Sequence, residues 1–303
     1  MTVSTELNSE MPTLAAIDAG GTTFKCALIQ EGRGIIAGVR IPTTQPEPTL
    51  RACAQFFKEQ KTKGLIASSM GIASFGPIDV DPNSSSYGMI LDGPKFGWAA
   101  TNLKDYFEQA LSIPVAIDTD VNGALLAELE WGAAKGVNAA AYVTIGTGIG
   151  AGLFANGSLI GKPNHPEFGH IRVQRHDADK AFSGGCSIHG DCLEGLASAA
   201  ALTRRFGNPT ELPDGHIGWV IEAYYLAQAC NVLSLMLRPD KIVLGGGLML
   251  APHLIGNVRH QYAQLMNNYL GQSKDEIDNL IVTPELGDDA GLFGGASLAK
   301  SNL

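Results

Sequence analysis

Two stretches of the chain share one layout, in which a short apolar run, a glycine-rich turn and a second apolar run follow one another. These are residues 14–18 and 24–29 around Gly20-Gly21-Thr22, and residues 141–145 and 149–154 around Gly146-Thr147-Gly148. Each layout predicts two strands joined by a tight turn. Because the second copy starts near the middle of a 303-residue chain, the repetition predicts two similar lobes.

The remaining patterns alternate helices with strands. The predicted helices are 49–62, 121–131, 193–205, 217–237, 251–270 and 290–300, and the predicted strands are 65–73, 113–118, 241–244 and 280–283. This order indicates a mixed α/β fold. We expect residues 12–120 to form the first lobe, with the helix at 289–303 packing back on it, and residues 121–288 to form the second. Residues 1–11 are expected to be a flexible polar tail.

Charge and hydropathy exclude several classes of protein. The net charge is −9, and no cluster of Lys and Arg provides a surface for phosphates, so nucleic acid is not an expected partner. The pair Arg204–Arg205 is expected on a solvated helix face. No run of about 18 apolar residues is present, which argues against a membrane span, and residues 1–10 lack the pattern of a secretory signal.

The chain has five cysteines, an odd number that argues against a disulfide framework. We expect the thiols to be metal ligands or core residues, and a cytoplasmic location. Cys26, Cys53 and Cys230 lie in apolar patterns and are predicted to be core residues.

A third glycine cluster, Gly245-Gly246-Gly247, stands between a predicted strand and a predicted helix. One such turn is typical of ordinary hairpins, but three together favour a nucleotide site, because glycines let backbone N–H groups approach phosphate oxygens. Thr22 adds a hydroxyl to the first turn. The sequence has neither the lysine motif of P-loop proteins nor the G-x-G-x-x-G fingerprint of dehydrogenases, so the simplest forms of both classes are excluded.

Asp120 is the strongest candidate for a catalytic base. It follows Asp118 and Thr119 where a predicted strand ends and a helix begins, a position that opens onto the carboxyl edge of a sheet. Phosphoryl transfer to an alcohol needs a carboxylate within hydrogen-bond reach of the attacking hydroxyl. The alternative is that Asp120 only caps the helix.

A metal site is predicted by the spacing of Cys186, His189 and Cys192, which places three donors on one tight turn. His170 would supply a fourth ligand and close a tetrahedral zinc site, and His176 is its rival. A cytosolic redox role for the cysteines is the alternative.

Four protein ligands would make this a closed, structural zinc site. Such a site would stiffen the segment that presents Glu167 and Glu194 rather than activate water. A second ring nitrogen of His170 could then face a substrate. The alternative for Glu194 is that it is an exposed acid in the first turn of a helix and binds no ligand.

These motifs resemble those of the ROK family, named for its repressors, open reading frames and kinases, a branch of the actin-like sugar kinases. The resemblance covers about residues 14–300. It rests on Asp18-Ala-Gly-Gly-Thr22, Gly76-Pro77, Asp120-Val-Asn122, Gly146-Thr-Gly-Ile-Gly150, Glu167-Phe-Gly-His170, the metal loop, Gly245-Gly246-Gly247 and Gly291-Leu-Phe-Gly-Gly-Ala296. It implies a two-lobed, actin-like α/β fold (sugar kinase/ribonuclease H-like) with the active site in the cleft between the lobes, and a homodimer.

Within the family, three segments are similar to those of bacterial fructokinases: the Cys-x-x-His-x-x-Cys loop, Ser74–Asp79 and Pro94–Trp98. The resemblance therefore implies phosphorylation of the 6-hydroxyl of D-fructose by ATP with Mg²⁺, and a structural Zn²⁺. Asp120 would be the base. The implied sugar contacts are Gly76, Thr119, Asp120, Glu167, His170 and Glu194. The implied contacts of ATP and magnesium are Asp18, Gly20, Gly21, Thr22, Gly146, Thr147, Gly148, Gly245, Gly246 and Gly247.

Two residues depart from the family pattern. Thr23 and then Lys25 follow the first turn where a lysine often stands directly after it, and Thr119 replaces the usual asparagine before the base. A hexokinase acting on glucose, mannose or an N-acetylhexosamine is the alternative enzyme. A sugar-responsive repressor would need a DNA-binding segment ahead of residue 14, where only about a dozen residues without basic character stand, and an inert scaffold would not need the three acids Asp120, Glu167 and Glu194.

Overall fold

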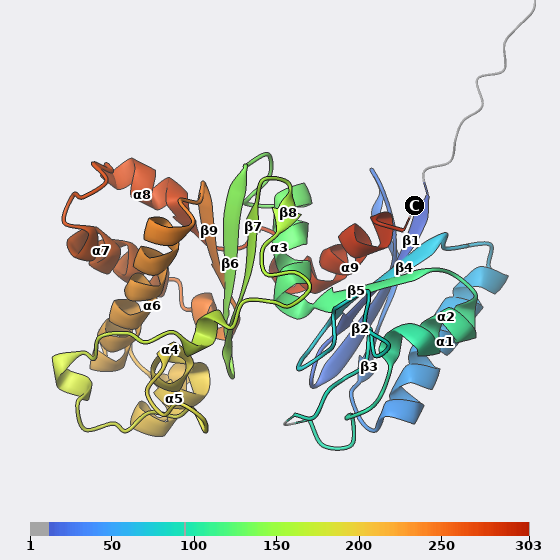
Figure 1. Ribbon diagram of the computed structural model, residues 1–303, viewed down its shortest axis with the longest axis horizontal. Coiled ribbons are helices and arrows are strands. Elements are labelled where there is room, and N and C mark those ends of the chain that lie inside the picture. Colours follow the sequence, from blue (N-terminus) through green and yellow to red (C-terminus); the bar gives the residue numbers. More distant parts are fainter. Residues whose placement is uncertain (1–11, 94, 303) are drawn as a thin grey trace, which may run out of the picture. The chain divides into compact units, whose positions relative to one another are not determined.

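The computed structural model describes residues 12–93 and 95–302. The chain forms two compact units (Figure 1): unit 1 comprises residues up to Gly123 together with the segment from Gly291, and unit 2 comprises Ala124–Ala290. The expectation for the tail at residues 1–11 falls outside the described residues.

Unit 1 is built on a five-stranded sheet in the order β3-β2-β1-β4-β5. Its strands are β1 (Thr13–Ala19), β2 (Thr23–Gln30), β3 (Gly34–Pro42), β4 (Ser69–Ser74) and β5 (Val115–Thr119). The first three strands are antiparallel neighbours, and β1, β4 and β5 run parallel. The predicted hairpin around Gly20-Gly21-Thr22 is therefore confirmed as the β1–β2 connection.

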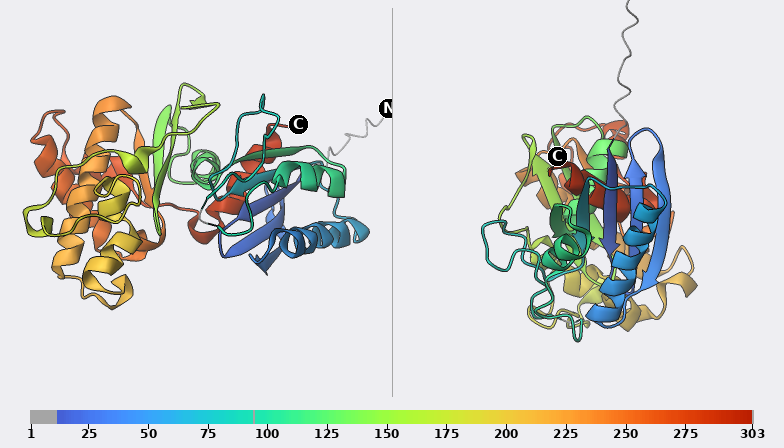
Figure 2. Two further views of the ribbon diagram at one scale, coloured as in Figure 1. Left: turned by 60° about the horizontal axis from the view of Figure 1, so that its bottom comes forward. Right: turned by 90° about the vertical axis from the view of Figure 1, so that its right-hand side faces the viewer.

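Helices cover both faces of this sheet (Figure 2). On one face lie α1 (Pro46–Thr62) and α2 (Leu103–Leu111). In α1, Leu50, Cys53 and Phe57 recur at helical spacing and are buried with Ile17 and other β-strand residues in one core. Successive residues of a strand point to opposite faces of the sheet, so the strand residues that alternate with these face a second layer of helices.

That other layer is α9 (Ala290–Lys300) with the first turn of α3 (Asp120–Trp131). The Ser69 hydroxyl donates to the Ala299 carbonyl at 2.9 Å. Where α3 and α9 cross, a Cβ on Gly294 would lie 2.4 Å from the Gly123 backbone, so only glycine permits this approach. The close packing of α9 on Gly123 thus holds the first turn of α3, which includes Asp120, in place.

Unit 2 repeats the topology of the first sheet, in the order β10-β9-β6-β7-β8. Its strands are β6 (Ala139–Ile145), β7 (Ile149–Ala155), β8 (Ser158–Leu159), β9 (Lys241–Gly245) and β10 (Ile281–Val282). Again three antiparallel neighbours, β8, β7 and β6, are followed by parallel β9 and β10. The second predicted hairpin is the β6–β7 connection.

The helices of unit 2 are α4 (Leu193–Ala197), α5 (Ala199–Phe206), α6 (Ile217–Met236), α7 (Leu254–Met266) and α8 (Lys274–Leu280). Short 3₁₀ turns occupy Phe168–His170, Asp177–Asp179, Pro209–Glu211, Gly247–Leu250 and Gly287–Asp289. Alternate residues of β6 divide between two cores: Ala141 and Val143 pack with α6, while Ala140 and Tyr142 pack with Leu125 of α3.

Several expectations differ from the structure. The predicted helix at 193–205 is two helices, because Ser198 adopts an extended conformation and its hydroxyl caps α5 by accepting from Ala201 N at 3.2 Å. Strand β3 and helices α2 and α8 were not expected. Cys26, Cys53 and Cys230 are buried as predicted, and all five thiols are free.

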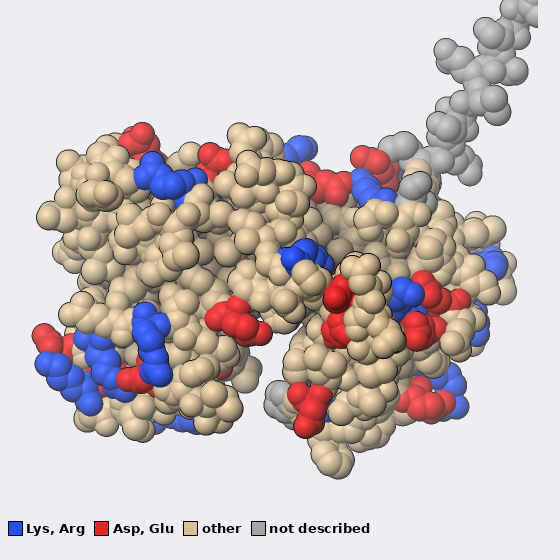
Figure 3. Space-filling view, viewed as in Figure 1, with Lys and Arg blue, Asp and Glu red and all other residues tan. Residues whose placement is uncertain are grey.

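Among the described residues, none of the helices has the length and apolar character needed to span a bilayer. On the face shown in Figure 3, Lys and Arg alternate with Asp and Glu and form no extended basic patch among the coloured residues.

Candidate functional site: two glycine turns, an acidic helix start and a Cys/His cluster

In unit 1 the predicted site residues gather at the carboxyl edge of the parallel strands. Ala19 of β1 pairs with Ser74 of β4, which pairs with Thr119 of β5. Neighbouring strands lie about 4.8 Å apart. The glycine turn, the Gly76 loop and Asp120 directly follow this row, so they begin side by side. The Phe75 amide also donates to the Ala19 carbonyl at 2.9 Å, which holds the Gly76 loop against the turn.

Asp18 precedes the first glycine turn and pairs with Lys25, whose Nζ lies 3.1 Å from its Oδ2. Both side chains are largely buried, with 13% and 19% exposed for Lys25 and Asp18 respectively. The two residues are also directly opposite in the β1–β2 ladder. The Lys25 ammonium is therefore paired with the Asp18 carboxylate in this structure.

Asp120 is the first residue of α3 and is exposed, whereas its neighbours Asp118 and Thr119 are buried. The Thr119 hydroxyl accepts from Asn122 N at 3.2 Å, and Asp118 Oδ1 accepts from the Asn122 side chain at 2.8 Å. Asp120 Oδ1 accepts from Val121 N at 2.9 Å. Thr119 thus caps the start of α3, and Asp120 is the exposed acid of this segment.

In unit 2 the second glycine turn is in direct contact with Glu194. Glu194 Oε2 accepts from Ile149 N at 3.0 Å, and a Cβ on Gly148 would lie 2.6 Å from the same oxygen. Ala199 N donates to the Gly146 carbonyl at 2.8 Å, so the start of α5 also lies on this turn. Glu194 is half-buried at the start of α4. Glu194 is therefore not merely an exposed acid in the first turn of a helix, because its carboxylate binds the backbone of the second glycine turn.

The third glycine cluster stands next to the second. Thr144 pairs with Gly245, and a Cβ on Gly246 would lie 2.5 Å from Ile145 backbone atoms. Gly247 and Leu250 line two cavities. The larger, of about 760 Å³, also includes Tyr142 and Pro284 in its wall.

The smaller cavity, of about 280 Å³, is walled on its other side by Trp219, His253 and Asp214. Trp219 Nε1 is buried and has no hydrogen-bond partner among the described residues. Both cavities could accept part of a ligand that approaches Gly247.

Glu167 and His170 lie on the 3₁₀ turn that packs against β7. A Cβ on Gly169 would lie 2.0 Å from the Ile149 carbonyl oxygen, so this turn lies directly on the strand that leaves the second glycine turn. The Glu167 side chain is 70% exposed, with Oε2 4.0 Å from His170 Nε2 and Oε1 3.1 Å from His165 Nε2. Glu167, His170 and Glu194 therefore all lie beside β7.

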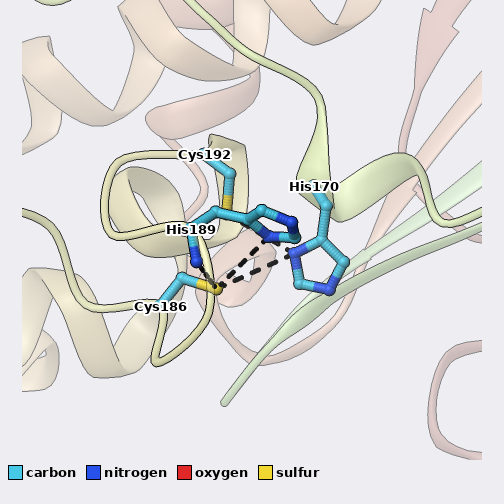
Figure 4. A group of neighbouring side chains, drawn as sticks. All are labelled: His170, Cys186, His189 and Cys192. Atoms are coloured by element: carbon cyan, nitrogen blue, oxygen red, sulfur yellow. Dashed lines mark hydrogen bonds between the residues drawn. The ribbon is translucent and has the colours of Figure 1, made fainter.

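The four predicted metal ligands form one cluster (Figure 4). The ligand atoms of His170, Cys186, His189 and Cys192 all lie within 4.8 Å of one another. Cys186 Sγ is 3.9 Å from His170 Nδ1 and 3.8 Å from His189 Nδ1, and Cys192 Sγ is 3.5 Å from His170 Nδ1. Zn–S bonds of about 2.3 Å and Zn–N bonds of about 2.1 Å set tetrahedral ligand pairs about 3.4–3.8 Å apart.

The donor set therefore fits a tetrahedral ion with two sulfur and two nitrogen ligands. Burial opposes ionisation of Cys186, but the backbone N–H groups of His189 and Ile188 stabilise its thiolate and lower its pKa overall. Burial raises the pKa of Cys192. The rival ligand His176 is outside the cluster, because its Nδ1 accepts from Ala178 N at 3.1 Å and its ring packs edge-on against Tyr224.

A buried polar network was not predicted. Arg205 Nη1 lies 2.6 Å from Asp179 Oδ2, with side chains only 5% and 4% exposed, and Tyr225 donates to the same oxygen at 2.8 Å. Arg205 also donates to the Leu196 carbonyl at the end of α4, the helix that carries Glu194. The expectation that the Arg204–Arg205 pair is solvated was wrong for Arg205. Its partner lies 26 residues away, beyond any local sequence signal.

Comparisons with known proteins agree with the geometry. The model of the ROK family matches residues 14–302, and the chain belongs to this family. A fructokinase of Zymomonas mobilis is 42% identical, with 93% of this chain and 95% of that protein covered. A fructokinase of Streptococcus mutans is 39% identical, with 94% and 96% covered.

Among solved structures, a ROK family glucokinase from Streptomyces griseus in complex with glucose and AMPPNP aligns with a TM-score of 0.72. It is 23% identical, with 95% of this chain and 99% of that chain covered. At that identity the likeness concerns the fold, and it confirms the two-lobed, actin-like sugar kinase architecture that the sequence predicted.

Proposed function

We propose that this protein is an ATP-dependent fructokinase, which transfers the terminal phosphoryl group of ATP to the 6-hydroxyl of D-fructose and yields fructose 6-phosphate and ADP. The fructokinases to which it is about 40% identical over nearly its whole length support this substrate. The observation that carries the chemistry is the exposed carboxylate of Asp120, which begins a helix at the same sheet edge as the first glycine turn, with β4 between them.

Asp120 acts as the base. It accepts the proton of the 6-hydroxyl as the oxygen attacks the terminal phosphorus, the new O–P bond forms, and the bond to the bridging oxygen of ADP breaks. Buried Asp118 and Thr119 stiffen the segment through Asn122 and hold Asp120 at the helix start. Gly76 and Thr119 lie beside the sugar, and Glu167, His170 and Glu194 bind its other hydroxyls.

The glycine turns bind ATP. Asp18, Gly20, Gly21 and Thr22 line the phosphates and Mg²⁺ in unit 1, and Gly146, Thr147 and Gly148 do so in unit 2. The nucleoside lies beside Gly245, Gly246 and Gly247, where the two cavities open. When bound, Mg²⁺ neutralises charge on the phosphate oxygens.

The Cys/His cluster holds a structural zinc ion. Four protein ligands would leave no open coordination position, so the ion would supply stability rather than Lewis acidity. Cys192 directly precedes α4 and thereby ties the cluster to Glu194, while His170 keeps Nε2 on the side of Glu167. We further propose a homodimer, on the family resemblance, and a cytoplasmic location, which five cysteines outside any disulfide support.

A panel of sugars assayed with MgATP tests the proposal. Fructose is expected to have the highest kcat/KM, and phosphorus–carbon coupling in the NMR spectrum of the product is expected at carbon 6. The alternative, a hexokinase, is favoured by the glucose bound to the structurally similar glucokinase. Higher kcat/KM for glucose, mannose or an N-acetylhexosamine than for fructose would replace the proposal by that alternative.

A further inference from the structure

Lys95 brings an ammonium group to the first glycine turn. Its Nζ donates a hydrogen bond to the carbonyl of Gly21, the middle residue of the turn, although the two residues are 74 positions apart. Among the described residues this carbonyl is its hydrogen-bond partner, so two of its three N–H bonds remain available to a ligand.

Buried aromatic contacts hold the Lys95 segment in place. Trp98 is fully buried, its ring centroid lies 5.3 Å from that of Phe24 and 5.5 Å from that of Phe75, and its Nε1 donates to the Thr44 carbonyl at 2.9 Å. Phe24 lies at the start of β2, directly after the turn, and Phe75 follows β4. The segment that carries Lys95 is therefore held by the residues that flank the first glycine turn and the Gly76 loop, Phe24 and Phe75.

The turn presents donors rather than acceptors to a ligand. The carbonyl of Gly20 accepts from the Thr43 hydroxyl at 2.7 Å, that of Thr22 accepts from Thr43 N at 2.9 Å, and that of Gly21 accepts from Lys95. In contrast, the amides of Gly21 and Thr22 donate to no backbone carbonyl within the described part of the chain. Free N–H groups beside an ammonium form an anion-binding concavity.

The other lysine near the turn cannot supply this charge. Lys25 Nζ lies 3.1 Å from Asp18 Oδ2, and both side chains are mostly buried. Its charge is therefore balanced by Asp18, whereas the partner of Lys95 is a neutral carbonyl. Lys95 is the ammonium whose charge is left for an incoming phosphate.

We propose that Lys95 contacts the phosphoryl group during its transfer and stabilises the negative charge on its non-bridging oxygens. The inference rests on the proposed binding of ATP phosphates by the first turn. As the bond to ADP breaks and the bond to the sugar oxygen forms, charge is spread over these oxygens, and a positioned cation lowers the barrier.

The test compares Lys95→Gln with Lys95→Arg. For Lys95→Gln we expect kcat to fall about 100- to 1000-fold, weaker binding of Mg-AMPPNP, and changes within about threefold in the KM for fructose and in ADP affinity. Lys95→Arg keeps the charge and should recover part of kcat. The matched control Lys58→Gln, on the exposed side of α1, should leave all four quantities unchanged.

Two results would overturn the inference. One is a kcat for Lys95→Gln within threefold of the wild type. The other is a parallel loss of AMPPNP affinity, ADP affinity and Tm, which would show that Lys95 only holds the turn together.

A separate variant tests the underlying proposal. A Cβ on Gly21 would meet no atom within 4 Å, so Gly21→Ala leaves the fold intact and places a methyl group where the phosphate is expected. Weaker AMPPNP binding by Gly21→Ala with an unaffected Lys95→Gln would refute the role of Lys95 alone. Full AMPPNP affinity in both variants would refute phosphate binding at this turn.

Discussion

The two units of this protein share one sheet topology but differ in the segments that connect their strands. In unit 1 the connection between β3 and β4 is little more than α1, and the exposed acid lies after β5. In unit 2 the connection between β8 and β9 extends over residues 160–240 and contains the Cys/His cluster, Glu167, Glu194 and α4 to α6. A repeated scaffold thus keeps its glycine turn in both copies, while different connections supply the other functional groups.

The largest expected effect concerns the acid of unit 1. Asp120→Asn removes the proposed base and should lower kcat by about 100- to 10,000-fold, since general base catalysis contributes that much. The measurement is steady-state turnover with fructose and MgATP. Asp105→Asn, at the exposed start of α2, serves as the control. Turnover of Asp120→Asn near that of the control would remove Asp120 from the mechanism.

The next effect concerns the cluster of unit 2. Cys186→Ser replaces a sulfur ligand, so we expect zinc content to fall from about one ion per chain and Tm to fall by several degrees. Both can be measured without substrate, by elemental analysis and calorimetry. Ser187→Ala in the same exposed loop should change neither. A metal-free wild type with an unchanged Tm would contradict the zinc site.

A smaller effect is expected from a buried acid of unit 2. Glu222 of α6 is fully buried, and neither of its carboxylate oxygens has a hydrogen-bond partner among the described residues. Burial raises the pKa of Glu222 well above the ordinary value of 4.5. The positive charge of Arg205 opposes this shift, and the negative charge of Asp179 adds to it. Above the ordinary glutamate pKa the unfolded chain releases this proton while the folded chain keeps it, so stability falls as pH rises.

Glu222→Gln removes this ionisable group from both the folded and the unfolded chain. We expect Tm of the variant to depend less on pH between 5 and 8 than Tm of the wild type, with the variant gaining relative stability toward the higher pH. Glu59→Gln on the exposed face of α1 is the control. Parallel pH profiles for wild type and Glu222→Gln would contradict the assignment of a protonated carboxyl.

The smallest effects compare helix caps across the two units. Asn102 caps α2 in unit 1 by accepting from Asp105 N at 3.0 Å, and Ser273 caps α8 in unit 2 by accepting from Glu276 N at 3.3 Å. Alanine at either position should cost about 1 kcal/mol, while Asn102→Asp and Ser273→Thr should cost less. Denaturant unfolding shows whether the two losses fall on one transition or on separate ones, and a loss above about 3 kcal/mol would contradict a simple cap.

Much of the fold and site could be predicted from local patterns. The hairpins followed from apolar runs around glycines, and the position of Asp120 at a helix start followed from its place after a strand. The Cys/His cluster followed from the spacing of Cys186, His189 and Cys192, and His170 lies close to them as predicted. Such features depend on residues near in sequence or on the rule that parallel strands end at one edge.

The features that could not be predicted depend on long-range contacts. The burial of Arg205 requires Asp179 and the Leu196 carbonyl, which only the folded segment brings together. Lys95 reaches Gly21 because Trp98 packs on Phe24, a contact without a periodic signal. The break at Ser198 results from a side-chain cap that interrupts an otherwise helical pattern.

The most direct test of the division of roles between the units is a calorimetric titration of fructose into three forms: wild type, Asp120→Asn and Glu194→Gln. The account predicts that Asp120→Asn binds fructose within about threefold of the wild type although its turnover is lost, because the base acts in the transition state. Glu194→Gln should bind fructose at least tenfold more weakly. Retained binding in Glu194→Gln together with lost binding in Asp120→Asn would contradict the account.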